Sequence, residues 1–212
     1  CHTRPNITYV VSVVSRYMHD PRSGHMDAVY RILRYLKGSP GKGLWFKRSG
    51  HLSLEGYCDA DWASSLDDRR STSGYCVFVG GNLVSWRSKK QPVVSRSTAE
   101  AEYRAMSVGL SEMLWLRNLL CELKLLKNTC MKLWCDNKSA INIANNPVQH
   151  DRTKHIEIDR FFIKEKLDEG MLKLDFVISG EQIADCLTKA LGVAECLSMC
   201  NKMGMIDIYR PS

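Results

Sequence analysis

Leu52-Ser-Leu-Glu-Gly-Tyr-Cys-Asp-Ala-Asp-Trp62 alternates between apolar and polar residues, which is the pattern of a half-buried β-strand. Leu54 and Cys58 fall on one face of this expected strand, and Asp59 and Asp61 fall on the other. Burying unpaired carboxylates is costly, so the strand ends either in a solvated acidic turn or at a cation site on the rim of a sheet. The second alternative requires other carboxylates to converge on Asp59.

The composition is that of a folded protein with a modest excess of positive charge. The 212 residues are enough for one domain plus additional elements, and the 44% of hydrophobic residues permit a core. The formal net charge of +7 favours anionic partners, nucleic acid included, without requiring them. No apolar run has membrane-spanning length and no signal peptide is visible, so we expect no membrane partner.

The nine cysteines are scattered without a Cys-x-x-Cys pair, and several, such as Cys76 and Cys135, fall within apolar patterns. We expect reduced core residues of an intracellular protein and no disulfide or zinc framework. His150 and His155 lack the second pair of ligands that a zinc site requires. The chain begins at Cys1 without an initiator methionine, which is compatible with the end of a longer polyprotein.

Hydrophobic periodicity and turn residues divide the chain into helices and strands. Two amphipathic helices at 5–18 and 28–37 predict an N-terminal helical hairpin, and Ser88–Pro92 predicts a basic loop. The expected strands are 44–46, 52–62, 73–79, 83–87, 131–136 and 171–178. The later expected helices are 97–126 with a bend at Gly109, 138–145, 154–168 and 181–190, before a partly helical tail.

The order of these elements predicts an α/β fold. Three consecutive strands followed by strand–helix crossovers imply a mixed five-stranded sheet flanked by helices, with the parallel strands added by right-handed connections. In open sheets of this kind, ligands gather beyond the carboxyl ends of the parallel strands. Asp59 and Asp136 both stand at ends of strands that such a sheet can place side by side.

Four acidic residues are candidates for one site: Asp59, Glu102, Asp136 and Asp185. Oxygen ligands with no histidine or cysteine partner select a hard cation, so we expect Mg²⁺, with Mn²⁺ as a substitute. Two such ions can clamp the attacking water and the leaving oxygen of a phosphodiester. The pattern alone does not establish the site, because any protein with this many acidic residues could supply four by chance.

Seven short motifs in a fixed order resemble a known family. They are Tyr57-Cys-Asp-Ala-Asp-Trp62, Asp67-Asp-Arg-Arg-Ser-Thr-Ser-Gly74, Val84-Ser-Trp-Arg-Ser-Lys-Lys-Gln91, Ser97-Thr-Ala-Glu-Ala-Glu-Tyr103, Leu133-Trp-Cys-Asp-Asn137, Arg152-Thr-Lys-His-Ile156 and Gln182-Ile-Ala-Asp-Cys-Leu-Thr-Lys189. Together they are similar to the ribonuclease H domain of copia-type retrotransposon Pol polyproteins, most of all to plant elements. Thr3-Arg-Pro-Asn-Ile7 and Arg31-Ile-Leu-Arg-Tyr-Leu-Lys37 resemble the end of the reverse transcriptase that precedes this domain.

The resemblance implies a ribonuclease H-like fold that cleaves the RNA strand of RNA–DNA hybrids with two Mg²⁺ ions. It places residues 1–47 at the helical end of the reverse transcriptase, 48–195 in the ribonuclease H-like domain and 196–212 in a C-terminal tail. It implies the reverse transcriptase portion of the same polyprotein as a partner. In an active element the location would be a cytoplasmic virus-like particle.

Residue by residue, the resemblance assigns the four carboxylates as metal ligands. Asp59 corresponds to the ligand on the first strand, Glu102 to the helix glutamate, Asp136 to the aspartate that ends the fourth strand and Asp185 to the C-terminal carboxylate. The chain departs from the family at Phe161, where histidine is usual, and at Asn6, which replaces an aspartate. Neither departure removes an expected ligand.

Helix geometry alone does not choose between Glu100 and Glu102. The apolar residues Ala99, Tyr103 and Met106 define the buried direction of the expected helix. At about 100° per residue, each glutamate lies roughly 80° to one side of that direction. The resemblance selects Glu102.

Six basic residues in the expected loops are candidates for contacts with a nucleic-acid backbone: Arg69, Arg70, Arg87, Lys89, Lys90 and Arg96. The alternative is an ordinary solvated basic surface. His155 is a candidate for an auxiliary role in product release, against a local packing or hydrogen-bonding role. Trp62 and Trp86 are expected to pack in the core.

Three functions are compatible with these observations. The first is a metal-dependent endonuclease that hydrolyses the RNA strand of hybrids during reverse transcription. The second is a catalytically inactive fragment of a retroelement that only binds nucleic acid. The third keeps the fold but cleaves DNA as a polynucleotidyl transferase, which the carboxylate motifs and the polymerase-like segment disfavour.

Overall fold

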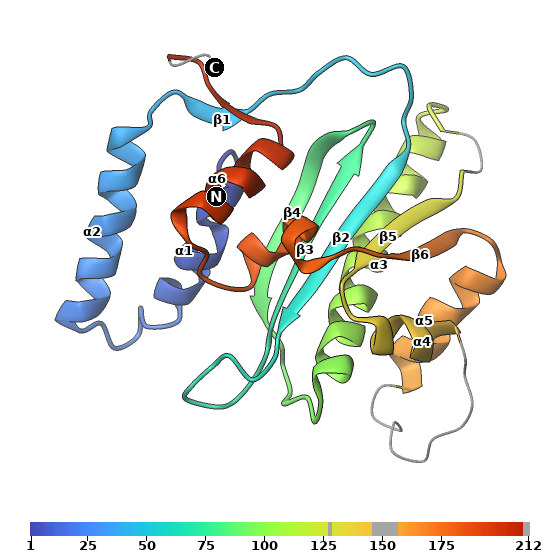
Figure 1. The fold of residues 1–212 in the computed structure, drawn as a ribbon, viewed down its shortest axis with the longest axis horizontal. Helices are drawn as coiled ribbons and strands as arrows, with labels where there is room; N and C mark the ends of the chain where they lie inside the picture. The colour runs from blue at the N-terminus through green and yellow to red at the C-terminus, as the bar shows by residue number, and fades with distance from the viewer. Residues whose placement is uncertain (127–128, 146–156, 210–212) are drawn as a thin grey trace.

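A mixed five-stranded sheet in the order β4-β3-β2-β5-β6 forms the centre of the fold (Figure 1). The structure is a computed structural model and describes residues 1–126, 129–145 and 157–209. Strands β2, β3 and β4 are antiparallel, whereas β5 runs parallel to β2 and β6 runs parallel to β5. The strands are β2 (Leu54–Asp61), β3 (Thr72–Val79), β4 (Asn82–Lys90), β5 (Met131–Cys135) and β6 (Leu172–Phe176).

Helices cover one face of the sheet. The long helix α3 (Thr98–Glu122) begins at Ser97, whose hydroxyl accepts a hydrogen bond from the Glu100 backbone N–H at 3.2 Å. Helices α4 (Lys138–Asn145) and α5 (Glu157–Asp168) pack beside α3. The core between α3 and the sheet is built from apolar residues of both, among them Leu54, Val77, Met106, Leu110, Met113 and Leu133.

The opposite face is covered by C-terminal elements that pack on a second core. The 3₁₀ helix η4 (Ile183–Leu187) lies against β2 and β3, and α6 (Val193–Lys202) packs on η4 (Figure 1). The second core contains Cys76, Phe78, Leu83, Leu187, Met199 and Met203. The sheet is therefore buried on both faces, which explains why β3 is buried along most of its length.

The N-terminal hairpin lies at the edge of the molecule. A short 3₁₀ helix, η1 (Pro5–Ile7), leads into α1 (Thr8–Ser15), which contacts β4, and α2 (Ser23–Gly38) packs on α1. Neither α1 nor α2 has a fully buried residue. Strand β1 (Lys42–Leu44) pairs with the C-terminal strand β7 (Met205–Asp207) in a separate two-stranded sheet.

The expected fold class is confirmed, and several element boundaries were wrong. Strand β4 continues through Lys90, so residues 88–90 of the expected basic loop are strand, because their backbone pairs with β3 up to Thr72. The first strand is at 42–44 instead of 44–46, since its partner is β7. Helix α3 runs through Gly109 without interruption and ends at Glu122. The expected helix 181–190 is replaced by η3 (Ser179–Glu181) and η4.

The remaining points concern the first helix, the helix expected at 154–168 and the boundary expected at residue 195. The first expected helix begins as η1 and becomes α-helical at Thr8. Residues 154–156 of the expected helix 154–168 lie outside the described residues. Helix α6 spans the proposed boundary at residue 195, and the division into parts at residues 47 and 195 stays a prediction. Within the described ranges, no helix combines the length and the apolar character needed to cross a membrane.

Candidate metal centre

The parallel pairing of β2 and β5 brings two aspartates together. Tyr57 pairs with Trp134, so Asp59, two residues further along β2, stands beside Asp136, which directly follows β5. Asp59 is only 3% exposed, because it lies on the sheet face that η4 covers. The predicted meeting of carboxylates at the strand ends thus results from strand register.

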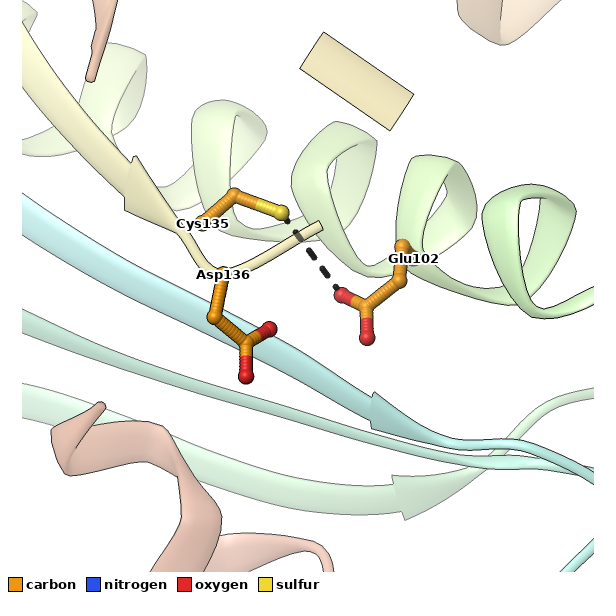
Figure 2. A group of neighbouring side chains, drawn as sticks. All are labelled: Glu102, Cys135 and Asp136. Carbon is orange, nitrogen blue, oxygen red and sulfur yellow. Dashed lines mark hydrogen bonds between the residues drawn. The ribbon is translucent and has the colours of Figure 1, made fainter. Parts of the chain in front are cut away.

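Helix α3 adds Glu102 from the other side of the sheet. Its side chain is buried and points towards Cys135 and Asp136, as Figure 2 shows. Glu100 is also buried, but its carboxylate accepts hydrogen bonds from the Arg96 backbone N–H at 2.8 Å and from the Arg104 guanidinium at 3.0 Å. Glu100 therefore stabilises the start of α3, and Glu102 faces the cleft.

Asp185 completes the group from η4. The side chain of Gln182 fixes this turn by donating to the Cys58 carbonyl at 2.9 Å. Gly74, which pairs with Asp59 across the β2–β3 ladder, lets η4 approach closely. A Cβ at Gly74 would lie 2.8 Å from side-chain atoms of Leu187 and Thr188. The absence of a side chain at Gly74 therefore brings Asp185 to Asp59.

The four predicted carboxylates form two overlapping groups. Ligand atoms of Asp59, Asp136 and Asp185 lie within 4.8 Å of one another, as do those of Glu102, Cys135 and Asp136. Asp136 belongs to both groups. Both groups adjoin an open cleft of about 600 Å³, which Trp62, Thr98, Lys138, Phe176 and Lys189 also line.

Burial and mutual repulsion shift the acidity of these groups. Burial and the charge of Asp185 raise the pKa of Asp59 to about 7, although the Thr188 hydroxyl, which donates to Asp59, opposes the shift. Burial and the charge of Asp59 raise the pKa of Glu102 to about 10. Burial raises the pKa of Asp185 too, against the effect of Lys189. Ionisation of these carboxyl groups is therefore disfavoured, and a cation placed among them would favour it, as Lys189 already does for Asp59 and Asp185.

The residues fit a divalent metal. Asp185 Oδ1 is buried and has no hydrogen-bond partner within the described part of the chain. The other carboxylate oxygen, Asp185 Oδ2, forms an ion pair with Lys189 at 3.0 Å. A buried carboxylate oxygen without a partner is costly, and a cation between Asp59, Asp136 and Asp185 would satisfy it. Carboxylate oxygens are the ligands that Mg²⁺ and Mn²⁺ prefer.

The sequence analysis missed two residues of this centre. Cys135 is a buried core residue, as expected, and its thiol in addition lies beside Glu102 and Asp136, which the sequence analysis did not foresee. The signal for its position was adjacency to Asp136 at the end of a strand. Lys189 was quoted only as part of a motif. It stands four residues after Asp185, and the negative charges of Asp59 and Asp185 raise its pKa, outweighing the lowering effect of burial.

The predicted basic residues separate into two sets. Arg70, Arg87, Lys89 and Lys90 line one groove of about 420 Å³ with Arg104 of α3 and Asp159 of α5. Arg69 and Arg96 are exposed and do not line it. Within the groove, Lys90 already forms an ion pair with Asp68 at 2.8 Å, and Arg70 lies 3.5 Å from the same carboxylate.

The other predicted positions are less informative. His155 lies outside the described residues. Phe161, which stands where histidine is usual in the family, is exposed on α5, so this replacement does not alter the core. Trp62 is half exposed at the cleft, where its indole N–H donates to the Ser95 carbonyl at 3.0 Å, and the expectation of core packing was wrong for this residue. Trp86 packs against the second core, as expected.

Comparison with known proteins shows homology to transposon polyproteins. The chain is 44% identical over 206 residues to the retrovirus-related Pol polyprotein from transposon RE1 of Arabidopsis thaliana, and 42% identical over 206 residues to that from transposon RE2. It is 42% identical over 189 residues to the Pol polyprotein from transposon TNT 1-94 of Nicotiana tabacum. The matches cover 97%, 97% and 89% of this chain but only 14% of each relative. No family model matches the chain.

Solved ribonuclease H structures are similar at low sequence identity. The N-terminal RNase H domain of Rv2228c from Mycobacterium tuberculosis aligns with a TM-score of 0.47 and 13% identity over 71% of this chain and 97% of its own. LC11-RNase H1, in complex with an RNA/DNA hybrid, aligns with a TM-score of 0.47 and 15% identity over 64% of this chain and 94% of its own.

The sheet order, with its acidic residues at the ends of β2 and β5, is that of a ribonuclease H-like fold. The chain belongs to the family of retrovirus-related Pol polyproteins of transposons.

Proposed function

We propose that this chain is the ribonuclease H domain of a copia-type retrotransposon and hydrolyses the RNA strand of RNA–DNA hybrids with two Mg²⁺ ions. The observation that carries the proposal is the pair of ligand groups that share Asp136. Homology to Pol polyproteins supports it, because reverse transcription leaves a hybrid whose RNA must be removed.

Each carboxylate has a defined task in this proposal. Asp59, Asp136 and Asp185 would hold one divalent cation, and Glu102 and Asp136 would hold the second. Bound divalent ions would supply Lewis acidity and an activated water. Lys189 neutralises Asp185 and keeps it close to Asp59. Hydrolysis would leave a 3′-hydroxyl on the RNA.

The groove between β4 and α3 is the proposed contact for the nucleic-acid backbone. Arg87 and Lys89 alternate along β4 with Trp86 and Ser88, so both extend on the side that faces α3. Contacts with phosphates bind without reading sequence, and the 2′-hydroxyl distinguishes RNA from DNA. The hybrid would therefore be selected by the shape of its groove and by the 2′-hydroxyl.

The N-terminal hairpin is proposed to pack on the reverse transcriptase portion of the same polyprotein. Its helices bury no residue fully here, and Val10, Met26, Tyr30 and Leu33 are exposed apolar side chains. Exposed apolar surface of this kind marks an interaction site. In an active element the complex would reside in a cytoplasmic virus-like particle.

The proposal is tested by incubating the chain with end-labelled RNA–DNA hybrid, with Mg²⁺ and with EDTA. We expect cleavage of the RNA strand with Mg²⁺ only, and no cleavage by Asp136→Asn, which is nearly isosteric but lacks the charge that holds the cation. Activity that survives EDTA would contradict the metal requirement. Hybrid binding without cleavage would support the inactive fragment, and cleavage of duplex DNA would support the transferase.

A further inference from the structure

The thiol of Cys135 lies beside two proposed metal ligands. Cys135 is the last residue of β5 and is fully buried. Its Sγ lies 3.8 Å from Glu102 Oε2, and the ligand atoms of Glu102, Cys135 and Asp136 lie within 4.8 Å of one another (Figure 2). A soft sulfur donor therefore stands at a centre whose other donors are hard oxygens.

The spacing of these atoms fits a tetrahedral cation. With a metal–sulfur bond of about 2.3 Å and a metal–oxygen bond of about 2.1 Å, the two donor atoms of a tetrahedral zinc site lie roughly 3.6 Å apart. The observed separation of 3.8 Å between Cys135 Sγ and Glu102 Oε2 requires only a small adjustment. Both donors already lie on rigid elements, β5 and α3.

The Cys135 thiol lies among acceptors for its proton, Glu102 Oε2 at 3.8 Å and the Asn137 carbonyl at 4.0 Å, and beside one backbone donor. The backbone N–H of Asn137 donates to Cys135 Sγ at 3.4 Å. The positive end of this dipole points at the sulfur and favours negative charge on it. Glu102 and Asp136 open on the cleft, so a cation entering from solvent meets these oxygens before the sulfur. The site therefore has an entry path, two oxygens and a polarised sulfur.

We propose that Glu102, Cys135 and Asp136 form a site for a thiophilic divalent cation of the zinc class, whose binding displaces the hard cation held through Asp136. As the metal–sulfur bond forms, the Cys135 thiol releases its proton to water. The binding site stands on these contacts alone, whereas the displacement rests on the proposed function. The consequence is inhibition of the nuclease by Zn²⁺ or Cd²⁺ in the presence of Mg²⁺.

The binding is tested by titrating the metal-free, reduced chain with Cd²⁺ and recording the ultraviolet absorption of the cadmium–thiolate bond. We expect one tight equivalent in the unaltered chain, and affinity weakened by about tenfold or more in Cys135→Ser. Glu102→Gln, which retains the thiol, should weaken the same equivalent. Circular dichroism of each variant verifies that it is folded.

Two other cysteine variants serve as matched controls. Cys130→Ser alters an exposed thiol, and Cys76→Ser alters a buried thiol on β3 that belongs to the second core. We expect both to retain the tight equivalent. Its retention in Cys135→Ser, or its loss in Cys76→Ser alone, would overturn the assignment, as would the absence of a tight equivalent in the unaltered chain.

The displacement is tested by hybrid cleavage at fixed Mg²⁺ with increasing Cd²⁺. We expect inhibition in the unaltered chain at the concentration that fills the absorbing site, and a shift of about tenfold or more to higher Cd²⁺ in Cys135→Ser, each variant normalised to its own rate without Cd²⁺. Equal inhibition of both would overturn the displacement. Absence of any cleavage would refute the proposed function and leave the absorption test intact.

Discussion

Glu100 and Glu102 are separated by one residue and have different partners. Glu100 is engaged with Arg104 and the start of α3, whereas Glu102 faces Asp136. We expect Glu102→Gln to abolish hybrid cleavage and to weaken Mg²⁺ binding measured by calorimetry. Glu100→Gln should keep the rate within about tenfold, which is roughly 1.4 kcal/mol of barrier, and should reduce the free energy of unfolding by about 1–2 kcal/mol. The reverse result would assign the metal to Glu100.

The raised pKa values of Asp59 and Glu102 predict a pH-dependent stability of the metal-free protein. The pKa of Asp59 rises from 3.8 to about 7 and that of Glu102 from 4.5 to about 10. At pH values between the unfolded and the folded pKa of each group, the folded state therefore binds more protons than the unfolded state. Stability is fully present below about pH 4 and is lost as the pH rises through 7 towards 10. We expect the Tm in EDTA to fall from pH 5 to 8, and less so with Mg²⁺ or in Asp59→Asn. A Tm that rises over this range in EDTA would exclude the shifts.

Among the elements, η4 depends on a glycine of the neighbouring strand. Gly74→Ala places a methyl group against Leu187 and Thr188 and should displace η4, with Asp185, from β2. We expect a loss of about 1–3 kcal/mol of stability in urea and weaker Mg²⁺ binding. Gly180→Ala, where a Cβ meets nothing within 4 Å, is the matched control. If Gly74→Ala is destabilised but binds Mg²⁺ with unaltered affinity, η4 does not contribute to metal binding.

The alternation of β4 predicts different roles for adjacent lysines. Lys89 lines the basic groove without an ion pair to Asp68, whereas Lys90 is held by that carboxylate. We expect Lys89→Ala to reduce the salt dependence of hybrid binding by about one phosphate contact and Lys90→Ala to reduce it by less. Asp68→Asn should release Lys90 and strengthen binding. If all three variants bind hybrid with the salt dependence of the unaltered chain, the groove does not contact the nucleic acid.

Sequence periodicity identified the elements that are buried on a regular face. Strands β2, β3 and β5 and helix α3 were predicted because their apolar residues repeat with the period of the element. The expected strand ended at Arg87, whereas β4 continues to Lys90, because lysines on an edge strand have the composition of a loop. The turn η4 was expected to be a regular helix, and only its packing against Gly74 explains why it is not. The core position of Cys135 was predicted correctly, but the local pattern does not show that its thiol also lies beside carboxylates of other elements.

At the scale of the whole molecule, the amides of α2 in the N-terminal hairpin should be less protected from hydrogen exchange than those of α3. Helix α2 contacts α1 and buries no residue fully, whereas α3 is enclosed between the sheet and α5. We expect amide hydrogen exchange measured by mass spectrometry to be faster in α2 than in α3 by several orders of magnitude. Equal protection of both helices would contradict the proposed attachment of the hairpin to the reverse transcriptase.

The pairing of β1 with β7 has a consequence for the order in which the chain matures during synthesis. A ribosome delivers β1 before the central sheet exists and β7 only after every other element has emerged. Long-range pairing of this kind forms late, because the loop between the two strands must first be shortened by folding. Until β7 has emerged, β1 has no partner strand, whereas α1 can already pack on β4 of the central sheet. We therefore expect the β1–β7 sheet to be the last of the described pairings to form.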